Sequence, residues 1–130
     1  MEIRTFPLGP LETNCYLAHA DGQAIVVDPG GDPAPLIAFL QEKELKLTHI
    51  LNTHLHFDHI FGNDALQEFT QAPIYANQED AYLLDTELGK GGVWGLPKVD
   101  DFTFKPLSPG ELSLLGSTCQ ALHTPGHTPG

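Results

Sequence analysis

The chain has 130 residues, of which 41% are apolar, and its 6 Lys and Arg against 17 Asp and Glu give a formal net charge of −11. This apolar fraction predicts one folded domain over residues 1–130 rather than a disordered chain, and no apolar run approaches the roughly 20 residues of a membrane-spanning helix. The acidic balance disfavours a nucleic-acid partner, because a phosphate-binding surface needs basic residues, so neither nucleic acid nor membrane is expected as a partner.

The N-terminus has no cationic start followed by an apolar core, so we predict a cytoplasmic protein without a secretory signal. In a cytoplasmic protein disulfides are rare. The two cysteines, Cys15 and Cys119, lie far apart in sequence and in apolar contexts. We therefore predict that both are buried thiols.

The first part of the chain predicts strands that lead into an α/β unit. Strands are expected over residues 3–8, 15–18 and 24–27, with Asp21-Gly22 as a hairpin turn between the second and the third. Asp32 is the expected N-cap of a helix that begins at Pro33 and continues to about Lys43. A strand over residues 45–52 completes a strand–helix–strand pattern, which is typical of α/β folds.

The second part continues with short elements. We predict a helix over residues 63–71, a strand over 73–76, a short helix over 78–84 and two strands over 112–115 and 118–123. The glycine-rich stretch from residue 89 to residue 102 is predicted to be a loop. Trp94 in this loop either forms a wall of the active site or belongs to a plain surface loop.

Three of the seven histidines lie within six residues, in the run Thr53-His54-Leu55-His56-Phe57-Asp58-His59. In an extended backbone, residues two apart point the same way, so His54 and His56 can face one point. The chain must then turn into a helix, which aims Asp58 and His59 at a second point nearby. This pattern, at the end of a strand, predicts metal binding by these four residues.

A catalytic zinc site usually has three protein ligands, so His54 and His56 require a third. A second histidine loop, His123-Thr124-Pro125-Gly126-His127, also follows a predicted strand, and we predict that His127 is the third ligand. His123 is predicted to have a structural or supporting role. Asp28, at the end of a buried strand, is either an acceptor for a ligand histidine or a turn residue before Pro29.

The run from Thr53 to His59 resembles the signature of the metallo-β-lactamase fold superfamily, and the chain is most similar to its glyoxalase II (hydroxyacylglutathione hydrolase) branch. Further matches are Asn14-Cys15-Tyr16-Leu17, Val27-Asp28-Pro29-Gly30-Gly31 and the His123–Gly130 loop. The resemblance implies an α/β (α+β) fold of the αββα sandwich type. In that fold the chain corresponds to the first half and the start of the second.

The resemblance also implies the ligands. His54, His56 and His127 would bind a first divalent metal ion, and Asp58 and His59 a second. Zinc is the expected metal, and iron or manganese would also tolerate this mixed set of ligands. Asp58 would in addition be the catalytic residue that orients the attacking hydroxide. The expected enzyme is a metal-dependent thioesterase whose substrate is a small S-acylglutathione-like thioester, cleaved by a metal-bound hydroxide.

Family members are longer and supply a further aspartate and a further histidine after the position of His127. We therefore expect that the sequence is a truncated form of a longer protein. The same motif leaves other functions open: a mono-iron persulfide dioxygenase, a lactonase or another superfamily hydrolase, and an inactive metal-binding fragment or interaction module. A β-lactamase is disfavoured because no export signal is visible, and a nuclease because of the acidic charge.

Overall fold

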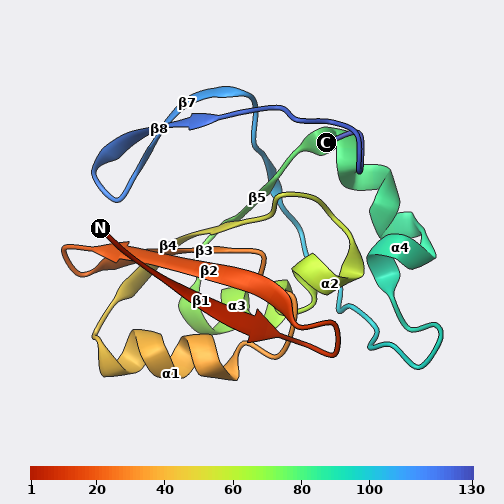
Figure 1. Cartoon of the computed structure of the whole chain (residues 1–130), viewed down its shortest axis with the longest axis horizontal. Helices are drawn as coiled ribbons and strands as arrows, with labels where there is room; N and C mark the ends of the chain where they lie inside the picture. Colours follow the sequence, from red (N-terminus) through yellow and green to blue (C-terminus); the bar gives the residue numbers. More distant parts are fainter.

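A six-stranded mixed sheet lies at the centre of the computed structural model, which describes residues 1–130 (Figure 1). Neighbouring strands follow the chain order, and the first two pairings are antiparallel while the other three are parallel. The strands are β1 (Glu2–Leu8), β2 (Thr13–Ala20), β3 (Gln23–Val27), β4 (Lys46–Leu51), β5 (Ile74–Ala76) and β6 (Lys105–Pro106). Parallel pairing needs a crossover between strands, and the helix between β3 and β4 provides the first one.

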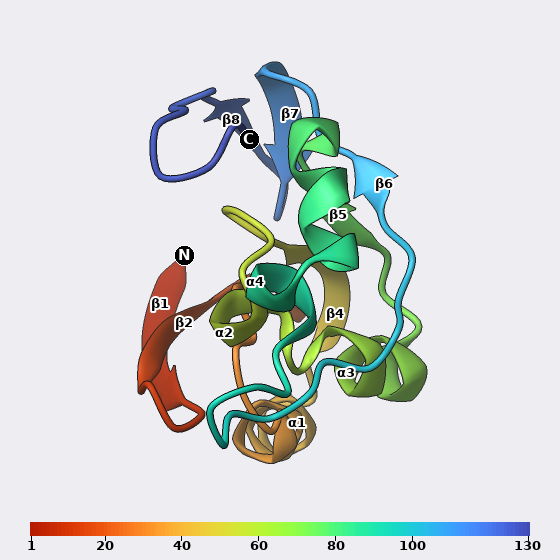
Figure 2. The ribbon, with the colours of Figure 1, turned by 90° about the vertical axis from the view of Figure 1, so that its right-hand side faces the viewer.

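Helices cover one face of this sheet, and a hairpin lies over the other (Figures 1 and 2). Helices α1 (Ala34–Glu42) and α3 (Asn63–Thr70) pack against the first face. The hairpin of β7 (Gly110–Leu114) and β8 (Ser117–Ala121) places Leu114 against Ala18 and Ile25 on the second face. None of the helices is both long and apolar enough to span a membrane.

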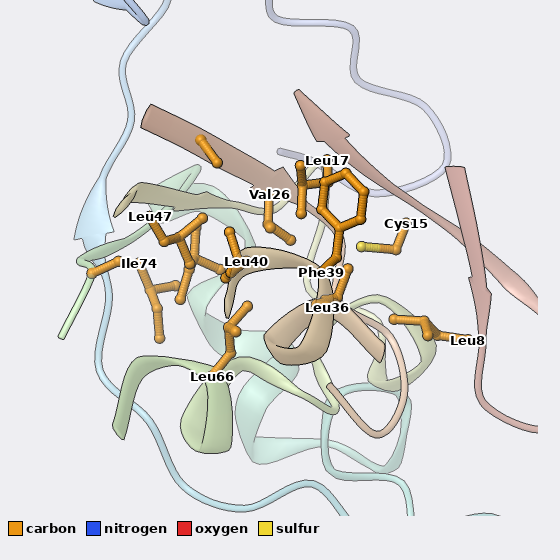
Figure 3. Packing of buried hydrophobic residues seen from close by; sticks show 13 residues of the cluster. Leu8, Cys15, Leu17, Val26, Leu36, Phe39, Leu40, Leu47, Leu66 and Ile74 are labelled. Carbon is orange, nitrogen blue, oxygen red and sulfur yellow. The ribbon is translucent and has the colours of Figure 1, made fainter. Parts of the chain in front are cut away.

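The main core forms where α1 and α3 meet the sheet (Figure 3). Alternate residues of β2 and β3 point toward the helices, as the two-residue period of a strand requires, and Leu17 and Val26 are fully buried there. The helices contribute Leu36, Phe39 and Leu66 to the same cluster. Each fully buried side chain of this size contributes about 1.5–3 kcal/mol, so this layer is a major source of stability.

Most of the predicted elements are confirmed within one or two residues. The predicted hairpin turn is also present, because both Asp21 and Gly22 have positive φ angles between β2 and β3. Helix α1 begins one residue later than predicted, at Ala34. The N-cap position is Pro33, which makes no side-chain capping hydrogen bond, so the predicted N-cap at Asp32 is wrong by one residue. Asp32 lies just before the cap, and its Oδ1 accepts a hydrogen bond from the Ala34 amide at 2.9 Å.

Three further predictions need correction, and one strand lies outside the predicted elements. The short helix after β5 is a 3-10 helix, η1 (Gln78–Asp85), and the predicted loop begins with the helical turn of α4 (Glu87–Lys90). Strand β6 was not predicted, because two residues carry no periodic signal. Cys119 in β8 is only half-buried, where it packs against the cluster of Ala18, Ile25 and Leu114. Cys15 is fully buried, and both thiols are free.

Glycines allow the loop after β3 to lie directly against the segment that carries Asp58. A Cβ atom on Gly30 would lie 1.7 Å from the main-chain oxygen of Asp58, and one on Gly62 would lie 2.5 Å from the oxygen of Gly31. The two backbones are therefore in contact without intervening side chains. This close approach sets the position of α2 (Phe57–Ile60), which carries Asp58 and His59.

We predict that Gly30→Ala lowers the free energy of unfolding by about 3 kcal/mol or more, because the new methyl group would overlap a main-chain oxygen that cannot move independently. Gly22→Ala is the control: it has φ +79° with open space around it, so only backbone strain of about 1–2 kcal/mol is expected. Denaturant titration measures both values. Equal losses in the two variants would contradict the proposed contact.

Candidate metal centre

Three loops meet beyond the carboxyl ends of the parallel strands, where ligands commonly bind in α/β sheets. The first follows β3 and contains Asp28, and the second follows β4 and runs from Thr53 into α2. The third follows β8 and carries His127. It ends beside the helical turns that precede α4 (Figure 1), where the Gly130 amide donates a hydrogen bond to Asp80.

The structure brings His54, His56 and His127 together. Their ring centroids form a nearly equilateral triangle, with separations of 4.8 Å for His54–His56, 4.8 Å for His54–His127 and 4.7 Å for His56–His127. One ring nitrogen from each histidine lies within 4.8 Å of the others, and these three residues are the only such group of potential ligands in the chain. These nitrogens are close enough to share one metal ion after small side-chain rotations that bring each to about 2.0–2.1 Å from it.

His54 presents a free nitrogen to this triangle. Its Nε2 is buried and has no hydrogen-bond partner, an arrangement that is costly unless another group binds it. The opposite nitrogen, Nδ1, lies 3.0 Å from Thr53 Oγ1, which lies 2.6 Å from Asp28 Oδ2. Because the carboxylate only accepts, the Thr53 hydroxyl donates to it and accepts from His54 Nδ1–H. That tautomer leaves the lone pair of His54 on Nε2, where a metal ion would bind.

Asp28 combines the two roles that its sequence position left open. It has a positive φ of 56° at the turn before Pro29, and its carboxylate also accepts from three groups. The donors are the Thr53 amide at 2.8 Å, the Thr53 hydroxyl at 2.6 Å and His59 Nδ1 at 3.0 Å. One buried side chain thus orients both His54, through Thr53, and His59 directly.

Asp58 and His59 lie next to each other but outside the triangle of three histidines. Asp58 Oδ2 lies 3.5 Å from His59 Nε2 and accepts a hydrogen bond from the Thr13 hydroxyl at 3.0 Å. The structure therefore orients both side chains toward a common point. No third potential ligand joins them among the residues of this chain.

Crowding sets the charge states of the histidines. Burial, with the neighbouring imidazoles of His59, His56 and His127, lowers the pKa of His54 to about 4. Burial and the proximity of His127 also lower the pKa of His56. For His59, burial acts to lower the pKa, but the hydrogen bond and charge of Asp28, together with the charge of Asp58, outweigh burial and raise it. His54 and His56 are therefore neutral near pH 7, as metal ligands must be.

The remaining predicted residues lie outside the triangle. His123 Nε2 lies 2.7 Å from the Pro129 carbonyl oxygen and 3.3 Å from a Glu79 carboxylate oxygen, which fits the structural role predicted for it. Trp94 is 91% exposed and forms no wall around the three histidines. Its loop does reach α2, because a Cβ on Gly91 would lie 3.3 Å from the Cβ of Phe57.

Several supporting residues were not anticipated from the sequence. Thr13 and Asp80 come from distant elements, and nothing in the local pattern marks either one. Thr53 and Thr128 each adjoin a histidine of the triangle, and this adjacency was the one available signal. A threonine beside a histidine is common in any chain, so this adjacency alone does not indicate that the hydroxyl supports a site.

The chain is also similar to proteins of known family. Residues 8–130 match the family model of the metallo-beta-lactamase superfamily. Among curated proteins, the probable metallo-hydrolase YqgX of Bacillus subtilis is 36% identical, and the hydroxyacylglutathione hydrolase GloC of Haemophilus influenzae is 34% identical. Both alignments cover 100% of this chain but only 63% and 64% of the relatives, so the chain spans less than two thirds of their length.

Two solved structures share the fold. The B3 metallo-beta-lactamase BLEG-1 has a TM-score of 0.88 and 34% identity, over 99% of this chain and 64% of that protein. TTHA1623, in a di-iron-bound form, has a TM-score of 0.81 and 36% identity, over 98% of this chain and 63% of that protein. Both support the mixed α/β fold expected from the sequence.

The pKa of His54 predicts how the metal-free protein responds to acid. The unfolded chain takes up a proton at this residue near its ordinary pKa of 6.5, whereas the folded chain does so only near about 4. His54 therefore lowers the free energy of unfolding as pH falls from 6.5 toward 4, and below that range its effect is constant. The raised pKa of His59 acts in the opposite direction.

His54→Gln should therefore make the melting temperature of the metal-free protein less sensitive to acid. We expect the difference in Tm between the variant and the parent to change steadily, in favour of the variant, as pH falls from about 6.5 to about 4. Calorimetry in the presence of a chelator measures it. A constant difference over that range would contradict the assigned shift.

Proposed function

Because the chain belongs to the metallo-beta-lactamase superfamily, we propose that His54, His56 and His127 bind a divalent metal ion in the catalytic centre of a hydrolase. The observation that carries this proposal is the convergence of three imidazoles around the buried, unpartnered Nε2 of His54. An ion held there would supply Lewis-acid chemistry, by polarising a carbonyl group and by making hydroxide available near neutral pH. The three ligands come from two loops, so the site forms only in the folded chain.

Asp58 and His59 are the proposed ligands from this chain for a second ion. Asp58 also has a proposed catalytic role. Its Oδ2 is held by Thr13, so Oδ1 is available to accept a hydrogen bond from the attacking water and to orient it toward the substrate carbonyl. Zinc is the proposed metal. Iron or manganese suits the same nitrogen and carboxylate donors, and the similarity to a protein solved in a di-iron-bound form supports iron.

We favour a thioester of the S-acylglutathione type as the substrate. The first support is the 34% identity to a protein named hydroxyacylglutathione hydrolase. The second is chemical: a thiolate leaves without being protonated, so the reaction suits a site whose histidines are held neutral as ligands rather than charged as acids. The acyl carbon would be attacked by water that Asp58 orients.

Hydrolysis of a β-lactam is a second candidate, and the similarity to BLEG-1 favours it specifically. Both reactions add water to an acyl carbon. They differ in the leaving group, since a β-lactam nitrogen must be protonated as the bond breaks. Side-by-side assays with S-lactoylglutathione and a chromogenic cephalosporin therefore distinguish the two candidates.

We predict that the full-length protein hydrolyses S-lactoylglutathione, that a chelator abolishes this activity and that added zinc, iron or manganese restores it. Asp58→Asn should lower kcat/KM by about 100-fold or more, because the amide orients water poorly. Asp64→Asn makes the same change in the first turn of α3 and should leave kcat/KM unchanged. Thioester turnover that persists in the chelated protein would contradict the proposal, and so would an active Asp58→Asn variant.

A further inference from the structure

Asp80 is a fully buried carboxylate in η1, on the inner side of the two histidine loops. It accepts three hydrogen bonds. The Leu55 amide donates to Oδ2 at 3.2 Å, the Thr128 hydroxyl donates to the same oxygen at 2.8 Å, and the Gly130 amide donates to Oδ1 at 2.7 Å. Neither its sequence context nor the proposed chemistry accounts for this side chain.

The three donors belong to the two loops that form the triangle of histidines. Leu55 lies between His54 and His56, and Thr128 directly follows His127. Leu55 is 25 residues from Asp80 in sequence, and Thr128 is 48 residues away. The Asp80 carboxylate therefore links the His54–His56 loop to the His127 loop. No side-chain hydrogen bond runs directly from one of these loops to the other.

Asp80 is itself held firmly. Its amide donates to the Asn77 carbonyl at 3.2 Å, and the Asn77 side chain caps the start of η1 by accepting from the Glu79 amide at 2.8 Å. The final loop fits closely against it, because a Cβ on Gly130 would lie 2.7 Å from Asp80 Cγ. Asp80 therefore provides a fixed point to which the loops attach.

No Lys, Arg or His lies within ion-pair distance of Asp80, so its carboxylate is buried with only neutral donors around it. Burying such a group is costly unless something compensates. A cation bound between the histidines would be attracted by this negative charge.

From these contacts we infer that Asp80 is a positioning residue, which holds the His54–His56 loop and the His127 loop at the separation that one metal ion requires. The inference rests on the proposed metal binding but not on any particular substrate. It predicts that Asp80 and Thr128 act as one unit in metal affinity, because the hydroxyl of Thr128 reaches the loop of His54 only through the carboxylate.

The test is zinc affinity in the full-length protein, measured by competition with a chromogenic chelator. Asp80→Asn keeps the shape but removes the charge and one acceptor, and we expect zinc Kd to rise by about 10- to 100-fold. Thr128→Val removes only the hydroxyl, and we expect a rise of about tenfold. The double variant should bind zinc no more weakly than Asp80→Asn alone, since the two changes break the same link.

Thr70→Val is the matched control. Thr70 is half-buried, whereas Thr128 is buried, and the Thr70 hydroxyl likewise donates a short hydrogen bond, of 2.7 Å, to the Leu66 carbonyl in α3. It should lower Tm without changing zinc affinity. Co²⁺ substitution adds a second readout, because loss of one histidine ligand changes the visible absorption of the ion. The spectrum of Asp80→Asn should shift toward that of His127→Gln.

The inference would be overturned if Asp80→Asn and Thr128→Val bind zinc as tightly as the parent does. It would also be overturned if these two variants lose no more zinc affinity than Thr70→Val does. If Asp80→Asn does not fold, Thr128→Val alone decides the matter by the same criterion. A parent protein that binds no zinc would overturn it too. A parent that binds zinc, responds to both substitutions and hydrolyses neither substrate would refute the proposed function and still support the inference.

Discussion

A buried carboxylate needs several hydrogen-bond donors in place of water, and this constraint organises the whole end of the sheet where the histidines lie. Asp28 collects donors from Thr53 and His59, and Asp80 collects them from Leu55 and Thr128. The loop after β4 is therefore held from two sides. Each carboxylate restricts the loop, and together they leave the His54 side chain little freedom.

The same packing explains why the histidines are suited to a metal ion. Partial burial of His54 and His56, together with the neighbouring imidazoles within 4.8 Å, disfavours protonation of His54 and His56. A neutral imidazole with a buried lone pair is a good ligand and a poor acid. His59 differs because Asp28 and Asp58 both contact it, and its environment favours the charged form.

Glycine gives this arrangement its compactness. Gly30 lets the loop after β3 touch the backbone of Asp58, and Gly130 lets the final loop touch Asp80. A Cβ atom at either glycine would collide with a residue of the site, with the main chain of Asp58 in one case and the carboxylate of Asp80 in the other. The loops of the site are therefore held by close main-chain contacts at glycines and by hydrogen bonds to buried carboxylates. Large apolar side chains do not fill the space between these loops.

The sequence by itself determined the local features. Alternating apolar residues, the Asp21-Gly22 turn and the Asp32-Pro33 pair predicted β2, β3 and α1. The spacing of His54, His56, Asp58 and His59 marked the candidate site. Each of these signals depends only on neighbours along the chain. The second histidine loop also predicted His127 as a partner of His54, and the tertiary structure brings the two together. The tertiary structure alone decided that Thr13 and Asp80 support the loops and that Trp94 lies in solvent. Contacts between residues 45 or more positions apart depend on how whole elements pack, which no local pattern specifies.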